Sequence, residues 1–342
     1  MNTPSDLHKW VSSGRDFLWL RKPGQNKVLC FGLGEPQKEP THSSVAICPF
    51  NSDSPAYYSI QQETSLDVDA LPTVSFQLPT ELEPSKMVST AQHQYMEQVD
   101  KALQVIQSGG LEKVVLAQTH WLKDITINPI EAFRRACKAI DSYAYLAYVG
   151  GECWIGSSPE LFLKSDYTTI ETVALAGTRL ATNASDAWGE KEIQEQSIVT
   201  TYLTETFEAL DFSDITVGTS FTKTVGHIQH ICNSITATKS NHLDVTKLLS
   251  ALHPTPALAG FPKTAAKSLI NETEVFSRDL YGGYIGYMDA GGMEYFVNIR
   301  CARLFNESAQ LFAGAGINRD SNPQSEWEET NNKLNVIKSI LV

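Results

Sequence analysis

The chain lacks any apolar run that approaches the roughly 20 residues needed to cross a bilayer as a helix. Its first ten residues, MNTPSDLHKW, are polar and carry no hydrophobic region of the kind found in signal peptides. With 342 residues, 42% of them hydrophobic and 19% charged, the composition is typical of an ordinary enzyme with a sizeable core. We therefore expect a cytoplasmic protein with no membrane partner.

The sequence also lacks a CxxC pair, although it contains six cysteines. They are scattered through apolar segments, and this pattern indicates reduced, buried thiols in a cytoplasm. The six are Cys30, Cys48, Cys137, Cys153, Cys232 and Cys301.

Positive charge is scarce: 27 Lys and Arg stand against 39 Asp and Glu, for a formal net charge of −12. This balance argues against a nucleic-acid or anionic-membrane partner, and an acidic substrate would need local positive charge to offset it. Nucleotide motifs are also missing. The AGAGI segment at 313–317 lacks GxGxxG spacing, and no Walker A motif occurs.

Strands are predicted in hairpins, such as 144–149 and 153–155 around Gly150-Gly151. We expect three antiparallel strands over 284–289, 294–304 and 310–315, and a long surface connection over 62–90. Paired strands favour an α+β fold with antiparallel sheets over a doubly wound Rossmann fold. Apolar periodicity predicts helices over 90–107, 128–140, 186–210, 243–252, 264–270 and 324–341.

Two carboxylate pairs occur at helical spacing, Glu192 with Glu195 and Glu326 with Glu329, and Lys333 follows four residues later. A spacing of three places each pair on one helix face. Mg²⁺ usually takes one or two carboxylates together with waters and an anionic substrate. If the two helices meet, they form a Mg²⁺ site open to an acidic ligand, although a single such pair is more often a solvated acidic turn.

Five segments together resemble the chorismate-utilising enzymes, which include anthranilate, aminodeoxychorismate, salicylate and isochorismate synthases. The resemblance covers residues 90–340 and implies one chorismate-binding domain, 1–342, with antiparallel sheets packed as a sandwich and helices outside. Residues 1–89 correspond to the variable N-terminal part and 90–342 to the catalytic core. The segments are KVVLA at 113–117, GSSPELFL at 156–163, ALAGTR at 174–179, HPTPALAG at 253–260 and AGAGI to EWEETNNK at 313–333.

The resemblance implies that Lys113 is the general base and Glu160 the general acid. Lys113 would deprotonate water for addition at C2 of chorismate, which requires a neutral amine, while Glu160 protonates the departing C4 hydroxyl. The ammonia-using branches lack this lysine, so its presence favours water as the nucleophile. Alone, Lys113 would be a strand-edge lysine and Glu160 a loop glutamate. Gln118 replaces an arginine common in the family, and we expect that change to affect packing or local charge.

The same resemblance implies the substrate contacts. Aminodeoxychorismate synthases carry a nucleophilic lysine where this chain has Ala176, so that activity is not expected. The HPTP start resembles isochorismate synthases, although His253 by itself is more often a packing histidine. Arg300 and Lys333 would bind the carboxylates. The full implied substrate-binding set is Gly177, Thr178, His253, Ala257, Leu258, Arg300, Gly314 and Lys333.

For the cofactor, the resemblance implies Mg²⁺ held directly by Glu195 and Glu329, with Glu192 and Glu326 supporting them through water or hydrogen bonds. His227 and His230, in GHIQHI, are three apart and suggest a metal site. The segment is predicted to be a strand, however, and we interpret His230 as structural.

These expectations converge on an isochorismate synthase, an isomerase whose substrate is chorismate, acting as a monomer without a glutamine amidotransferase subunit. The alternatives are a salicylate synthase, which also eliminates pyruvate, an ammonia-dependent large subunit, and a non-catalytic binding protein. The product could feed menaquinone, siderophore or salicylate formation, and the sequence leaves that choice open.

Overall fold

Strand pairing runs as one continuous antiparallel ladder through the computed structural model, which describes residues 4–73, 76–80, 82–83, 86–181, 187–225, 228–239 and 244–342. The ladder folds back on itself at β4 (Ala56–Asp67), which pairs with β2 in one leaf and β3 in the other. The first leaf runs in spatial order β13 (Gly260–Phe261), β5 (Lys113–Leu122), β17 (Ala309–Ile317), β16 (Cys301–Leu304), β7 (Glu152–Ser158), β6 (Tyr143–Val149), β1 (Phe17–Arg21) and β2 (Lys27–Gln37). The second runs β3 (Ser44–Cys48), β14 (Tyr284–Asp289), β15 (Gly292–Val297), β8 (Leu161–Ser165), β9 (Thr169–Leu180) and β12 (Ile228–Thr238), with β10 (Ser213–Val217) and β11 (Phe221–Val225) on β12.

The two leaves pack face to face over a shared apolar core. Leu18 and Leu20 of β1 lie in one cluster with Ile285 of β14 and Phe296 of β15. The alternate residue Trp19 points to the opposite face, as the two-residue period of a strand requires. Each side chain of this size contributes roughly 1.5–3 kcal/mol when fully buried.

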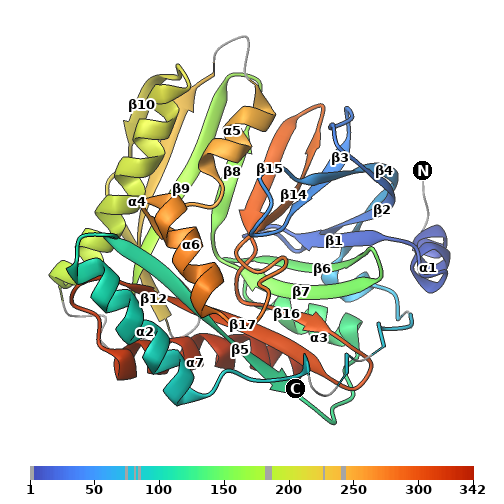
Figure 1. The fold of residues 1–342 in the computed structure, drawn as a ribbon. Helices are drawn as coiled ribbons and strands as arrows, with labels where there is room; N and C mark the ends of the chain where they lie inside the picture. Colours follow the sequence, from blue (N-terminus) through green and yellow to red (C-terminus); the bar gives the residue numbers. More distant parts are fainter. Residues whose placement is uncertain are drawn as a thin grey trace.

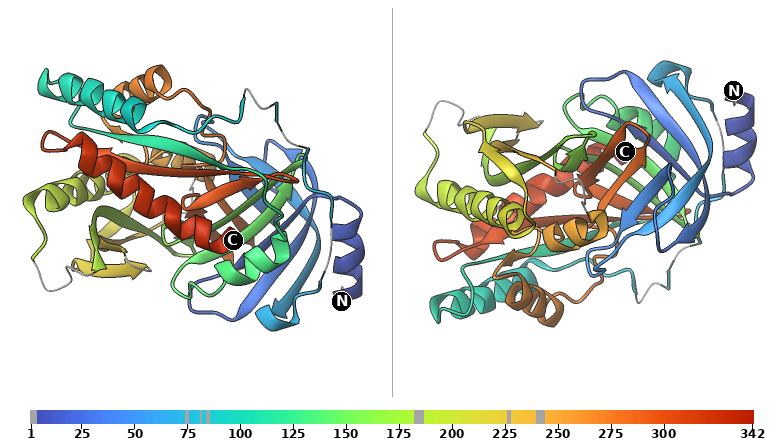
Figure 2. Two further views of the ribbon diagram at one scale, coloured as in Figure 1. Left: turned by 90° about the horizontal axis from the view of Figure 1, so that it is seen from below. Right: turned by 90° about the horizontal axis from the view of Figure 1, so that it is seen from above.

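Helices cover the outer faces of both leaves (Figures 1 and 2). Helices α3 and α7 pack on the first leaf, α4 and α5 on the second, and α2 and α6 against β5. Their bounds are α1 (Pro4–Ser12), α2 (Gln92–Gln107), α3 (Pro129–Ala136), α4 (Glu190–Ala209), α5 (Val245–Leu252), α6 (Lys263–Thr273) and α7 (Pro323–Leu341), with a 3₁₀ turn at Val68–Ala70. The prediction of an α+β sandwich of antiparallel sheets with helices outside is confirmed.

One strand prediction is wrong in a way that matters for the site. The segment 294–304 is not a single strand, because it divides into β15 and β16, which belong to different leaves. The chain crosses between the leaves at 298–300, where Asn298 is fully buried and accepts a hydrogen bond from the Tyr145 hydroxyl at 2.6 Å. This crossover carries Arg300.

Other differences are smaller. The predicted connection 62–90 is partly strand, because β4 continues to Asp67, and the sequence patterns do not predict α1 and β1. Asn128 begins α3 as expected, since its side chain accepts hydrogen bonds from the amides of Ile130 and Glu131. The six cysteines are unpaired and buried. Within the described ranges, no helix combines the length and apolar character that a membrane span requires.

Candidate active site

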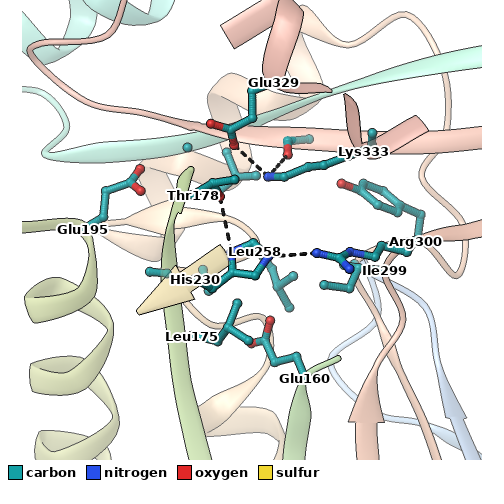
Figure 3. Close-up of a pocket in the computed structure, with 18 of the residues that line it drawn as sticks. Glu160, Leu175, Thr178, Glu195, His230, Leu258, Ile299, Arg300, Glu329 and Lys333 are labelled. Carbon is teal, nitrogen blue, oxygen red and sulfur yellow. Dashed lines mark hydrogen bonds and ion pairs between the residues drawn. The ribbon is translucent and has the colours of Figure 1, made fainter. Parts of the chain in front are cut away.

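A pocket of about 760 Å³, counting its open mouth, lies where β5, β9, β12 and β17 meet α4, α7 and the crossover (Figure 3). Most of the predicted site residues line this pocket, whereas His253, Glu192 and Glu326 do not. The predicted residues that line it are Lys113, Glu160, Gly177, Thr178, Glu195, Ala257, Leu258, Arg300, Gly314, Glu329 and Lys333.

Gly177 forms one wall through a β-bulge. In the pairing of β9 with β12, Thr178 is opposite His230 and Ala176 is opposite Ile231, so Gly177 is the extra residue. Its φ of +68° is a conformation that favours glycine, and a Cβ there would lie 2.8 Å from the Cβ of Glu192. The bulge leaves the Gly177 amide free to donate to Glu195 Oε2 at 3.2 Å.

The side chains of Glu195 and Lys113 face each other on the side of the pocket that Gly177 forms. Both are buried, and Lys113 Nζ lies 3.7 Å from Glu195 Oε1, which has no hydrogen-bond partner. Gly316, also in the pocket, permits this approach, because a Cβ there would lie 2.3 Å from Glu195 Oε1 and 2.9 Å from Lys113 Cε. No expectation from the sequence named Gly316, although the AGAG repeat contains it.

Glu160 lies between β7 and β8 and is buried. Burial raises the pKa of its carboxyl to about 8, against the opposing effect of the cations Lys223, Lys113, Lys333 and Arg300. Lys223, from β11, donates to the carbonyl of Pro159 at 2.6 Å and so holds the residue before the acid. The carboxyl is therefore a proton donor at neutral pH.

Arg300 reaches the pocket from the crossover with a φ of +50°, a rarely occupied conformation for a side chain of its size. Its Nη2 donates to Nε2 of His230 at 2.8 Å, while its buried Nη1 has no partner. Burial lowers the pKa of Arg300 to about 10, so it remains charged at neutral pH. His230 lines the pocket as well, whereas His227 lies outside the described residues.

Both carboxylates of the acidic pair on α7 have cationic partners. Lys333 donates to Glu329 Oε1 at 2.8 Å and to the carbonyl of Gly314 at 2.9 Å. Glu326 is buried and forms an ion pair with Lys191 at 2.5 Å. Burial and the neighbouring Glu329 raise the pKa of Glu326, while Lys191 acts to lower it. Across the described residues, no cluster of three or more His, Cys, Asp or Glu has the geometry to hold a metal.

A hard divalent cation nevertheless fits the donor set that the pocket offers. Glu195 and Glu329 both line it, and Oε1 of Glu195 is a buried carboxyl oxygen that has no hydrogen-bond partner and lies 3.7 Å from Lys113 Nζ. Because Mg²⁺ takes only one or two protein carboxylates and completes its shell with water and substrate oxygens, two carboxylates are sufficient.

His253 does not fit the substrate-binding role expected for it. Its ring packs edge-on against the stacked rings of Phe162 and Tyr284, and its Nε2 is 3.2 Å from the carbonyls of both Pro49 and Phe50. Burial lowers its pKa to about 4. We therefore assign His253 to the core.

Several other predicted positions have clear surroundings. Ala257 and Leu258 line the pocket, as does Ala176, where a lysine nucleophile would have stood. Gln118 is buried and donates to the hydroxyl of Thr330 at 2.6 Å, a packing role that ties β5 to α7.

Sequence reasoning missed Arg278, Tyr281, Ile299 and Phe312 in the lining. Arg278 donates four hydrogen bonds within the protein, to both oxygens of Glu274 and to the carbonyls of Val115 and Leu258. We therefore assign it to supporting the wall of the pocket. The four-residue spacing of Glu274 and Arg278 was the signal available in the sequence.

The site combines the buried carboxyl of Glu160, the buried amine of Lys113 and the guanidinium of Arg300, whose Nη1 has no hydrogen-bond partner. This combination defines an enzyme site for a small substrate that carries carboxylates. A family model described as "Chorismate binding enzyme" matches residues 45–342. The chain therefore belongs to the chorismate binding enzymes.

Individual relatives agree with this family. The chain is 26% identical to isochorismate synthase MenF of Escherichia coli (strain K12) over 98% of this chain and 90% of that protein. It is 30% identical to anthranilate synthase component 1 of Saccharolobus solfataricus over 74% of this chain and 63% of that protein. Several other curated relatives are matched over only about half of their length. The solved structure of E. coli MenF has the same fold, with a TM-score of 0.82, 20% identity, and coverage of 98% of this chain and 91% of that one.

Proposed function

We propose that the protein is an isochorismate synthase, which isomerises chorismate by adding water at C2 and losing the C4 hydroxyl. The observation that carries the proposal is the presence of Lys113 and a protonated Glu160, both buried, in one pocket of a chorismate binding enzyme. The relatives named isochorismate synthase support it.

The charges of the pocket suit a dicarboxylate. Nη1 of Arg300 has no hydrogen-bond partner, and Lys333 of α7 lines the same pocket. A guanidinium and an ammonium favour carboxylate ligands, and their local charge offsets the −12 of the whole chain. Arg300 binds one carboxylate and Lys333 the other, with Gly177, Thr178, Gly314, Ala257 and Leu258 shaping the space around the ring.

Lys113 and Glu160 move the protons. Lys113, as the neutral amine, takes a proton from the water that attacks C2. Glu160 gives its proton to the C4 hydroxyl, which leaves as water. One water enters and one leaves, so the product has the composition of the substrate and no redox cofactor is required.

Mg²⁺ is part of this proposal. Glu195 and Glu329 would hold it, while Glu192 and Glu326 support them through water or hydrogen bonds. Bound there, the ion would supply positive charge that neutralises a substrate carboxylate.

Two residues separate this reaction from its neighbours in the family. Ala176 provides no nucleophile for a covalent intermediate, and Lys113 favours water over ammonia. We therefore propose that the enzyme acts without a glutamine amidotransferase subunit. We also propose a monomer, which is what the resemblance to isochorismate synthases implies. The six unpaired, buried thiols support a reducing compartment such as the cytoplasm. Menaquinone or siderophore formation would consume the product.

The test is to incubate the purified protein with chorismate and Mg²⁺, with and without EDTA, and to separate the products by chromatography. We expect a mixture of chorismate and isochorismate that is lost with EDTA. Salicylate with pyruvate would assign the protein to the salicylate synthases, and no conversion would overturn the proposal.

A further inference from the structure

His230 is engaged at both ring nitrogens by the walls of the pocket. Its Nδ1 lies 3.0 Å from the carbonyl of Gly177 and 3.4 Å from the hydroxyl of Thr178, and its Nε2 lies 2.8 Å from Nη2 of Arg300 (Figure 3). A carbonyl can only accept a hydrogen bond and a guanidinium can only donate one. These partners define one tautomer, with the proton on Nδ1 and a bare Nε2.

The bulge at Gly177 produces this arrangement. Because Gly177 is the extra residue of β9, its amide is directed at Glu195 and its carbonyl at His230. Gly177 therefore connects Glu195, the predicted metal ligand on α4, to His230 on β12. His230 then extends the connection to the guanidinium on the opposite wall.

Arg300 needs such a partner. Its backbone is in the left-handed region, its guanidinium is buried, and its Nη1 has no hydrogen-bond partner. The contact with His230 occupies Nη2 and fixes the plane of the fork, which leaves Nη1 for a ligand.

We propose that His230 is a positioning residue that, as a neutral imidazole, holds the Arg300 guanidinium in the orientation that binds a substrate carboxylate. The inference rests on the proposed function, because it takes chorismate as the source of that carboxylate. His230 itself does not exchange a proton with the substrate, since both nitrogens are occupied by the protein.

The surroundings keep the imidazole neutral. Burial, Arg300, Lys333 and Lys223 lower the pKa of His230 well below its usual value, and only the hydrogen bond to Gly177 opposes them. The imidazole is therefore neutral at pH 7, where its Nε2 can accept from Arg300.

Two isosteric variants separate the two contacts. In His230→Gln, the amide oxygen can take the place of Nε2 and accept from Arg300. In His230→Asn, the shorter amide can take the place of Nδ1 and donate to Gly177, but cannot reach Arg300. His230→Leu removes both contacts.

Chorismate affinity by calorimetry, with KM and kcat, tests the proposal. We expect His230→Leu and His230→Asn to raise Kd and KM about 10- to 100-fold, the usual cost of losing a hydrogen bond to a charged group, with a smaller change in kcat. His230→Gln should recover most of the affinity. Added to Arg300→Met, His230→Leu should have little further effect. Equal losses in the Gln and Asn variants, or additive losses in the double variant, would overturn the proposal.

A second measurement does not depend on turnover. In protein labelled with ¹⁵N-histidine, the Nε2 of His230, assigned by its absence from His230→Gln, should have the chemical shift of an unprotonated nitrogen from pH 5.5 to 8. A protonated Nε2 would overturn the proposal even if the enzyme is active. If wild-type protein neither binds nor converts chorismate, the proposed function fails, and these spectra still decide whether His230 holds Arg300.

Discussion

Lys113 on β5 and Glu195 on α4 meet across the pocket at 3.7 Å, Nζ to Oε1, with both side chains buried. The first residue belongs to one leaf of the sandwich and the second to a helix on the other leaf. Gly316 keeps the space between them open. The proposed base therefore lies next to the proposed metal ligand.

Replacing Lys113 by alanine should abolish product formation while leaving chorismate binding largely intact. The amine acts on water and not on the carboxylates, so we expect kcat to fall about 100-fold or more and Kd to change little. Lys101→Ala is the matched control, because Lys101 is exposed and forms a surface ion pair with Glu272. Normal turnover by Lys113→Ala would rule out Lys113 as the base.

The pH dependence should follow Glu160. Its pKa is raised to about 8, so the acid is protonated below that pH and kcat should fall as pH rises through 8. The folded protein retains a proton on Glu160 that the unfolded chain releases near 4.5, so this group lowers the free energy of unfolding as pH rises from 4.5 to 8, by about 1.4 kcal/mol per pH unit. Other buried groups add their own pH dependence, so the contribution of Glu160 is the difference between the urea-unfolding pH profiles of wild type and Glu160→Gln. Identical profiles for the two proteins would contradict the assignment.

The charge of Lys223 should lower the pKa of Glu160. Lys223 is the strongest of the cations that lower the pKa of Glu160, and it holds the Pro159 carbonyl. Lys223→Met should therefore move the alkaline limb of the kcat profile to higher pH. Lys164→Met serves as control, since Lys164 is exposed on β8. Movement of the limb to lower pH would mean that Lys223 does not act on the acid through its charge.

Glu195 should govern the requirement for Mg²⁺. Glu195→Gln keeps the shape of the side chain and removes the anionic oxygen, so we expect the Mg²⁺ concentration for half-maximal activity to rise about 10-fold or more. Calorimetric titration with Mg²⁺ should show the same loss. Glu205→Gln, on the exposed face of α4, is the control. An unchanged Mg²⁺ requirement would exclude Glu195 as a ligand.

Gly177→Ala should cost more stability than an equivalent substitution elsewhere. The left-handed backbone costs a side chain about 1–2 kcal/mol, and the added Cβ would also meet Glu192. Gly150→Ala is the matched control, because Gly150 has a φ of +58° and nothing within 4 Å of the added Cβ. Equal losses in thermal unfolding would show that the Glu192 contact has no effect.

Much of the site could be predicted because motifs fix which residues occupy the ends of strands. The resemblance named Lys113, Glu160 and Arg300, and all three line one pocket. The sequence could not give the environment of each residue. Within 294–304, Asn298 and Arg300 interrupt the apolar residues, but single polar residues also occur inside strands, so the sequence does not mark the crossover at 298–300 that turns Arg300 toward His230. His253 shows the converse: this residue of a matching motif packs edge-on against two stacked aromatic rings and contacts the carbonyls of Pro49 and Phe50. Those partners are distant in sequence, so the motif could not reveal them.

The most direct test of the central claim uses chorismate and Mg²⁺ in H₂¹⁸O, with isochorismate isolated at early times and its mass determined. Since Lys113 is proposed to activate water at C2, each isochorismate formed should carry one ¹⁸O, in its C2 hydroxyl. Isochorismate without the label would show that the hydroxyl does not come from solvent, and would contradict the account.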